Sequence, residues 1–216
     1  MSILRLSEGV RVAVLCFAFA GAAWANSFSF AGTFSTDDQL AQILFTLAAP
    51  ATVTTVTWSY AGGTDQAAQV IPEGGFDPWL SIFDSSGNLL ASNDNGTCGQ
   101  VPTDSSTGSC FDSYISASFN AGTYLLVLSE SDNQPAGTTL GDGFTRTGQG
   151  DFTGSEFFCS NGSFCDANFT NRSPNWEVDI DNVTSAGSAI PEPATIFLSL
   201  AGAAVLILLP RRRSRS

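Results

Sequence analysis

The 216-residue sequence contains no histidine and no lysine, so all eight of its basic residues are arginines. Without histidine, the chain cannot form the Ser–His or Cys–His pairs that activate a catalytic nucleophile. Without lysine, it cannot form a P-loop for nucleotide phosphates. The G-x-S-x-G motif, which carries the nucleophile of many hydrolases, is also missing. These absences predict that the protein is not an enzyme.

One enzyme class remains open because it needs only two carboxylates, as in glycoside hydrolases. A chain with 20 acidic residues always offers such a pair, for instance Glu73 and Glu156. No motif around either residue supports this assignment.

Positive charge is scarce between Asn26 and Ala189, where only Arg146 and Arg172 accompany eighteen acidic residues. This segment therefore has a formal charge of 2 − 18 = −16. Binding to nucleic acid or to anionic lipid depends on basic side chains that neutralise phosphates, so no nucleic-acid partner is expected. The simplest interpretation is a soluble, solvated surface, and the alternative is a surface that attracts divalent cations.

The first 25 residues have the composition of a secretory signal peptide. Two arginines make the start weakly basic, residues 12–23 form an apolar core, and Ala23-Trp24-Ala25 places small residues at both positions of an A-x-A cleavage site. Cleavage there would make Asn26 the first residue of the mature protein. An uncleaved anchor is the alternative, but the apolar core is well short of the roughly 20 residues that span a bilayer.

The cysteine content agrees with export. Cys16 would leave with the signal peptide, and four cysteines would remain. An even number of cysteines in an oxidising compartment indicates disulfides, whereas their spacing and the lack of histidine argue against zinc. Four cysteines permit three pairings, and we favour the two local ones because each closes a loop rich in glycine and serine. The sequence therefore predicts the disulfides Cys98–Cys110 and Cys159–Cys165.

The chain ends in an uncharged apolar segment, residues 194–209, followed by arginines. As a helix this segment would extend roughly 24 Å, somewhat less than the roughly 30 Å of a bilayer core, and arginine side chains can reach across the difference. We expect a transmembrane helix over about residues 194–210 with a cytoplasmic C-terminus. A plain anchor is one interpretation, and a GPI signal is disfavoured because such tails end in apolar residues. The arginines expected to stop transfer are Arg211, Arg212, Arg213 and Arg215.

Immediately before the apolar segment stands Pro191-Glu192-Pro193. The order of Pro-Glu-Pro, apolar helix and terminal arginines over residues 190–216 resembles the PEP-CTERM sorting signal of Gram-negative bacteria. This resemblance implies that exosortase, a membrane transpeptidase-like enzyme, recognises and processes the tail at these three residues. It also implies an exported protein of the cell envelope, cell surface or extracellular matrix, associated with extracellular polysaccharide and biofilm. The membrane contact through the C-terminal helix would precede processing.

Residues 26–189 show the alternation of apolar and polar side chains that is typical of β-strands. Three segments have this period of two, which predicts strands with one buried face. In the third segment Glu177, Asp179 and Asp181 are expected to face solvent. The three segments are residues 55–60, 114–119 and 176–181.

Three further segments are apolar on both faces and are predicted to be central strands. Turns rich in glycine and asparagine separate the predicted strands. We therefore predict an all-β domain over residues 26–189, an antiparallel β-sandwich of about eight or nine strands with a jelly-roll or Ig-like arrangement. About residues 132–172 are expected to form a long excursion from it. The central strands are predicted at residues 42–47, 79–83 and 123–128.

The core resembles a second family over residues 42–133. The stretches "ILFTLAAPATVTTVTWSYAGG", "GGFDPWLSIFDSSGNLLASNDNG" and "DSYISASFNAGTYLLVLSESDN" are similar to the bacterial pre-peptidase C-terminal domain, a secreted β-sandwich in which some Asp-rich loops bind calcium. No EF-hand spacing is present, and residues 84–87 can equally form a hairpin turn in which the aspartate accepts backbone N–H bonds. The candidate calcium ligands are Asp77, Asp84, Asn93, Asp94 and Asp112.

Together these features predict an exported, non-enzymatic β-sandwich that acts as an adhesive or structural module linked to exopolysaccharide or biofilm. The alternative is a secreted carbohydrate-binding module or glycoside-acting enzyme. A binding module would use exposed tryptophans among Trp58, Trp79 and Trp176, although tryptophans at these spacings belong more often to a core.

Overall fold

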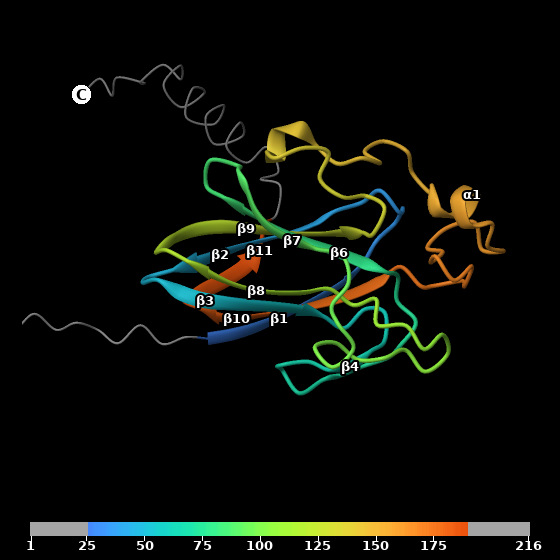
Figure 1. The fold of residues 1–216 in the computed structure, drawn as a ribbon, viewed down its shortest axis with the longest axis horizontal. Helices are drawn as coiled ribbons and strands as arrows, with labels where there is room; N and C mark the ends of the chain where they lie inside the picture. Colours follow the sequence, from blue (N-terminus) through green and yellow to red (C-terminus); the bar gives the residue numbers. More distant parts are fainter. Residues whose placement is uncertain (1–25, 190–216) are drawn as a thin grey trace, which may run out of the picture.

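The computed structural model describes residues 26–189, which form two facing antiparallel β-sheets (Figure 1). The first sheet has the strand order β1-β10-β3-β8, the second has the order β11-β2-β9-β6-β7, and β4 pairs with β5 in a small separate hairpin. The predicted antiparallel β-sandwich is confirmed. The strands are β1 Asn26–Thr33, β2 Ala41–Leu47, β3 Ala51–Thr57, β4 Gly63–Thr64, β5 Val70–Ile71, β6 Pro78–Asp84, β7 Leu89–Asn93, β8 Tyr114–Phe119, β9 Gly122–Glu130, β10 Asn175–Val183 and β11 Ser185–Ser188.

Residues 1–25 and 190–216 lie outside the described residues. The predicted signal peptide, transmembrane helix, sorting residues and stop-transfer arginines all fall in these two segments. Within residues 26–189, no helix has the length and apolar character needed to cross a membrane. The described chain ends just after β11, at one edge of the second sheet.

Aliphatic and aromatic side chains from both sheets fill the space between them. Val53 and Ile180 of the first sheet and Phe45, Leu80 and Leu126 of the second are fully buried in one cluster. In β2, buried residues alternate with less buried ones, as expected for a strand with one face toward a core. Burial of each such side chain contributes about 1.5–3 kcal/mol, so this layer is the main source of stability.

The predicted strands agree with the structure except at one end. The segment expected at residues 55–60 is confirmed only in part, because β3 ends at Thr57. The chain leaves the sheet there because the carboxylate of Asp112 accepts the backbone N–H groups of Tyr60, over 3.0 Å, and Ala61, over 2.8 Å. The strands expected at residues 42–47, 79–83, 114–119 and 123–128 are confirmed as β2, β6, β8 and β9.

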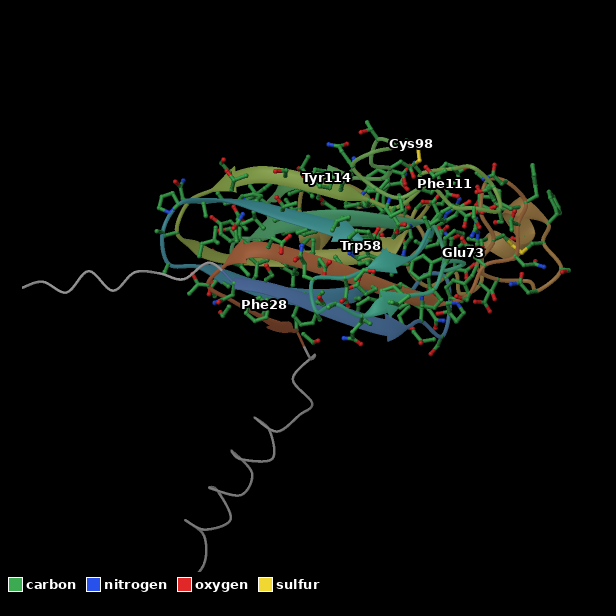
Figure 2. All side chains as sticks on the ribbon, turned by 90° about the horizontal axis from the view of Figure 1, so that it is seen from below. Phe28, Trp58, Glu73, Cys98, Phe111 and Tyr114 are labelled. Atoms are coloured by element: carbon green, nitrogen blue, oxygen red, sulfur yellow. A yellow bond between two sulfur atoms is a disulfide. The ribbon has the colours of Figure 1, made fainter. Side chains whose placement is uncertain are left out.

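The prediction that Glu177 and Asp179 face solvent is wrong, since both are buried. Residues 58–75, here called the 58–75 loop, fold back over the outer face of β10 and cover them. The indole N–H of Trp58 donates to Asp179 over 2.7 Å, and the backbone N–H of Gln66 donates to the same carboxylate over 3.0 Å. Figure 2 shows Trp58 over the middle of this sheet.

Residues 131–174 form the predicted long excursion, which connects β9 to β10. It contains a short 3-10 helix, Leu140–Asp142, and one turn of α-helix, α1, at Thr153–Phe157. The buried carboxylate of Asp37 ties the excursion to the sandwich by accepting the backbone N–H groups of Thr153 and Phe164, each over 2.8 Å. The Asp37 carboxylate thus satisfies two backbone N–H groups that would bond to a neighbouring strand if the excursion were part of a sheet.

Arg172, near the end of the excursion, has a buried guanidinium group. Its Nε donates to Asp166 over 2.8 Å and its Nη1 donates to Asp104 over 3.0 Å. The guanidinium carbon lies 3.7 Å from the centre of the Tyr60 ring, a cation–π contact. Asp104 lies between β7 and β8 and Tyr60 lies in the 58–75 loop, so Arg172 joins three separate segments.

We predict that Arg172→Met lowers the free energy of unfolding by about 3–5 kcal/mol, because it leaves two buried carboxylates without their cation. The matched control is Arg146→Met, since the ion pair of Arg146 with Glu156 is partly exposed. Loss of such an exposed pair costs about 0–1 kcal/mol. Urea denaturation of the purified protein measures both changes, and equal losses in the two variants would contradict the prediction.

Candidate functional site

Both predicted disulfides are present. Cys98 and Cys110 are bonded with their Cα atoms 5.4 Å apart, and Cys159 and Cys165 are bonded with their Cα atoms 5.9 Å apart. Both separations are ordinary for a disulfide. The first bond closes the loop before β8, and the second closes the part of the excursion that follows α1.

Asp84 belongs to a hairpin turn between β6 and β7. Its carboxylate accepts the backbone N–H groups of Ser86, over 2.8 Å, and Asn88, over 2.9 Å, and it also accepts the Asn88 side-chain amide over 2.8 Å. The bond from the Asn88 amide is the first cause that lowers the pKa of this carboxyl below its usual value. The carboxylate of Asp84 is therefore used to hold the hairpin turn, as the alternative to calcium binding proposed.

Asp112 and Asn93 are also committed to backbone groups. Besides Tyr60 and Ala61, Asp112 accepts the hydroxyl of Thr57 over 2.8 Å. Burial raises the pKa of Asp112 to about 6 in spite of these bonds. The side-chain oxygen of Asn93 accepts the backbone N–H of Tyr114 over 2.9 Å. These two side chains hold β3, β7 and β8 in place.

Asp77 and Asp94, the remaining candidates, are brought together with Glu130. Asp77 directly precedes β6, Glu130 ends β9, and the register pairs the neighbouring Pro78 with Glu130. Burial, followed by the charges of Asp94 and Glu130, raises the pKa of Asp77 well above its usual value. One carboxylate oxygen of Asp77 and one of Asp94 are buried without a hydrogen-bond partner. We call Asp77, Asp94 and Glu130 the Asp77 site.

The hydroxyl of Ser113 marks a convergence of oxygen atoms beside Asp77 and Asp94. It lies 2.7 Å from the carbonyl oxygen of Pro78 and 2.8 Å from that of Asn93, and it also contacts the carbonyl oxygen of Asp94. A hydroxyl has one proton and can satisfy only one of these three acceptors. The Asp77 site is therefore rich in oxygen acceptors and poor in donors.

Glu130 and Asp132 were missed by the sequence analysis. Glu130 is fully buried, and burial raises its pKa well above the usual value, although the backbone N–H of Asp132 donates to it over 2.9 Å. Burial, followed by the charge of Asp132, raises the pKa of Asp94 to about 6. The sequence did contain one clue to Glu130. It closely follows a segment that is apolar on both faces, so its carboxylate is carried toward the interior by a buried strand.

Oxygen atoms of carboxylates and carbonyls are the ligands that calcium prefers. Within residues 26–189, however, no three acidic or cysteine side chains are already grouped so that they could hold a metal ion. A calcium ion at the Asp77 site would therefore use Asp77, Asp94 and backbone carbonyl oxygens. The unpartnered oxygens of Asp77 and Asp94 fit this use.

A second group of acids lies under the 58–75 loop, on the outer face of β10. Glu177 is 1% exposed, and no backbone N–H, hydroxyl or amide group donates to its carboxylate oxygens. Burial, followed by the charges of Asp179 and Asp65, raises the pKa of Glu177 to about 9. Asp179 differs because it accepts hydrogen bonds from Trp58 and Gln66. Glu177 thus carries a proton at neutral pH.

The three tryptophans named in the carbohydrate-binding alternative are all half-buried. Trp58 covers Asp179, Trp79 donates its indole N–H to Ser81 over 3.1 Å, and Trp176 packs against Phe34 with ring centres 6.0 Å apart. Trp176 also lines a cavity of about 390 Å³.

The two carboxylates named in the glycosidase alternative have separate partners. Glu73 lines the same cavity as Trp176 and accepts the hydroxyl of Ser105 over 2.8 Å. Glu156 forms the 2.5 Å ion pair with Arg146 and is not among the cavity's lining residues.

Calcium is expected to stabilise the protein through the Asp77 site. A ligand that binds only the folded state at a hundredfold excess over Kd adds about 2.7 kcal/mol, which raises Tm by about 5–10 °C for a chain of this size. We predict such a difference between thermal melts in millimolar calcium and in chelator, and its loss in the double variant Asp77→Asn, Asp94→Asn. Asp84→Asn, the control in the turn, should keep the difference. Identical melts with and without calcium would show that these acids hold no calcium.

The protonated state of Glu177 predicts a specific dependence of stability on pH. Between the ordinary pKa of 4.5 and the folded-state pKa of about 9, the unfolded chain has lost this proton while the folded chain retains it. The free energy of unfolding should therefore fall as pH rises through this range, by at most about 1.4 kcal/mol per pH unit from this residue. In Glu177→Gln, the free energy of unfolding should fall less steeply with pH. Urea denaturation at a series of pH values, with chelator present, measures this slope. A variant with the wild-type slope would contradict the assignment.

The sequence matches no protein-family model. It also has no significant match among curated proteins. The functional conclusion therefore depends on the sequence of the tail and on the acids, disulfides and cavity described above.

Proposed function

We propose that the protein is exported and sorted at its C-terminus by an exosortase, and that its sandwich acts without catalysis in the envelope or extracellular matrix of a Gram-negative bacterium. The observation that carries this proposal is the order of Pro191-Glu192-Pro193, an apolar segment and four arginines at the end of the chain. Proline disfavours helical backbone in the residue before it, so an extended Glu192 would be accessible to the enzyme at the membrane surface.

Two features of residues 26–189 support export. Two disulfides suit an oxidising compartment outside the cytoplasm. The charge of −16 over this segment, counted as 2 − 18, suits a soluble domain that avoids nucleic acid and anionic lipid. We further propose that the sandwich is of the pre-peptidase C-terminal type, with a jelly-roll or Ig-like arrangement, and that it serves as an adhesive or structural module linked to exopolysaccharide.

Calcium is the proposed ion of this module. The support is the pair of buried, unpartnered oxygens on Asp77 and Asp94, together with the three carbonyl oxygens that converge on Ser113. Extracellular calcium would then rigidify the end of the sandwich where β6, β7 and β9 meet the adjoining loops. Before processing, the membrane would hold the protein through its C-terminal helix, and exosortase would be its first partner.

A secreted carbohydrate-binding module is the second candidate. The observation that favours it is the cavity lined by Trp176, Glu73 and Glu177. Apolar and polar residues line it together, as in many small-ligand sites, and the volume of about 390 Å³ lies within the usual range for such sites. A glycoside-acting enzyme has less support, because Glu156 is paired with Arg146.

Sorting predicts a specific processing defect. In the native host, Glu192→Ala should leave export intact while an uncleaved form that retains the arginine tail accumulates in membranes. Thr195→Ala, a control in the apolar segment after Pro-Glu-Pro, should be processed normally. Mass spectrometry of the membrane and extracellular fractions measures the C-terminus. Wild-type protein that still carries Arg211 to Ser216 would show that the tail is a plain anchor.

A further inference from the structure

Strand β8 forms one edge of the first sheet, so it pairs with β3 on one side and leaves its other side open. Just before the strand begins, the backbone N–H of Thr57 donates to the carbonyl of Ser113 over 3.0 Å. The residues of an antiparallel strand bond alternately to its two sides, so the N–H and C=O groups of Ser116 and Ser118 point away from β3. No strand of the described residues pairs with these four backbone groups.

The open side of β8 is accessible over the second half of the strand. At the first residue, the backbone N–H of Tyr114 donates to the side chain of Asn93 on β7 over 2.9 Å, which closes that end. Beyond it, Ser116 and Ser118 are exposed. A hollow of about 320 Å³ lies beside Ser118, and Leu90 of β7 is in its lining. Another strand can therefore approach β8 from Ser116 onward.

Strand β8 lacks the features by which proteins usually block an exposed edge. Its sequence, YISASF, contains no charged residue and no proline, and its register with β3 has no bulge. The neighbouring edge strand β7 differs, because its register with β6 is irregular and the N–H of Leu89 donates to Thr138 of the excursion over 2.8 Å. In a segment with a charge of 2 − 18 = −16, β8 is thus a place where a strand can pair without like-charge repulsion between the strands.

The positions of the chain ends favour a second copy of the protein as the partner. The described chain begins in β1 and ends just after β11, which are the sheet edges opposite β8 and β7. Figure 2 shows Tyr114 at one edge of the first sheet and Phe28, on β1, at the other. Both ends of the described chain therefore lie on the far side of the sandwich from β8. A second copy, in contrast, brings an identical uncharged strand to the open edge.

We propose that two copies of the protein associate by antiparallel pairing of their β8 strands, so that the first sheet continues from one copy into the other. A two-fold axis at Ala117 places Ser116 of each copy opposite Ser118 of the other. Each of these two pairs exchanges two backbone hydrogen bonds, so all the open groups of both serines are satisfied. The small side chain of Ala117 allows the close approach that the central pair requires.

Sedimentation equilibrium of the purified protein over a concentration series tests the proposal, at about 0.15 M salt to screen the repulsion between acidic domains. Ser118→Pro removes the N–H that points away from β3, a position where an edge strand tolerates proline. It should weaken dimerisation about tenfold or more, because symmetry removes two hydrogen bonds at once. Ser118→Ala keeps the N–H and should dimerise like the wild type. Both variants lose the 2.8 Å contact with the Thr52 hydroxyl, so the backbone donor distinguishes them.

Crosslinking provides a test that does not depend on the folding of the proline variant. In Ala117→Cys the two new thiols lie at the axis, where Cα atoms about 4.5 Å apart suit a disulfide. The four cysteines of residues 26–189 are already bonded within each copy. Mild oxidation should therefore link two copies, as measured by non-reducing gel electrophoresis. Ala31→Cys, at an exposed residue of β1, should remain unlinked.

Three outcomes would overturn the proposal. Protein that stays monomeric throughout the concentration series would show that β8 does not pair with a second copy. Equal dimerisation of Ser118→Pro and Ser118→Ala, with both variants folded by near-UV circular dichroism, would place the contact elsewhere. Equal crosslinking of Ala117→Cys and Ala31→Cys would do the same. The inference concerns assembly and goes beyond sorting, which is read from the C-terminus of the protein made in its host, so either idea can fail without the other.

Discussion

The buried guanidinium of Arg172 organises one end of the sandwich. It pairs with Asp104 and Asp166 and stacks on Tyr60, so it joins the loop before β8, the excursion and the 58–75 loop. Buried carboxylates are tolerated only with a cation, a proton or enough hydrogen-bond donors. The only other arginine in residues 26–189, Arg146, is partly exposed, so every other buried acid of this segment must be accommodated without an arginine.

Five other acids with buried carboxyl oxygens show three solutions to that constraint. Asp37 and Asp112 accept several backbone N–H and hydroxyl groups, and they fix the excursion and the end of β3. Glu177 keeps its proton, since its pKa is raised to about 9. Asp77 and Asp94 retain oxygens without partners. The first solution stabilises the fold, whereas the other two leave a protonated carboxyl group and carboxylate oxygens without hydrogen-bond partners.

The sequence predicted those features that depend on neighbouring residues. Alternation along a strand is local, so β2, β6, β8 and β9 were predicted correctly, and so were disulfides that close short loops. Features that depend on tertiary contacts were not predicted. The covering of Glu177 by a loop more than 100 residues earlier, or the approach of Glu130 to Asp77 across two paired strands, leaves no pattern in the local sequence. For the same reason the sequence suggested Asp84 and Asp112 as calcium ligands, although both carboxylates accept backbone N–H groups in the structure.

We propose that several buried acids of this sandwich stay protonated or unpartnered while no external cation is bound. Carboxyl carbon chemical shifts, measured by NMR on labelled protein without divalent cations or amines, test this claim most directly because they report each proton. At pH 7 the account predicts that Glu177, with its pKa raised to about 9, has the shift of a protonated carboxyl. Asp77 and Glu130 should likewise titrate well above ordinary acids, and added calcium should ionise Asp77 while leaving Glu177 unchanged. Ordinary carboxylate shifts for all three residues at pH 5 and above would contradict the account.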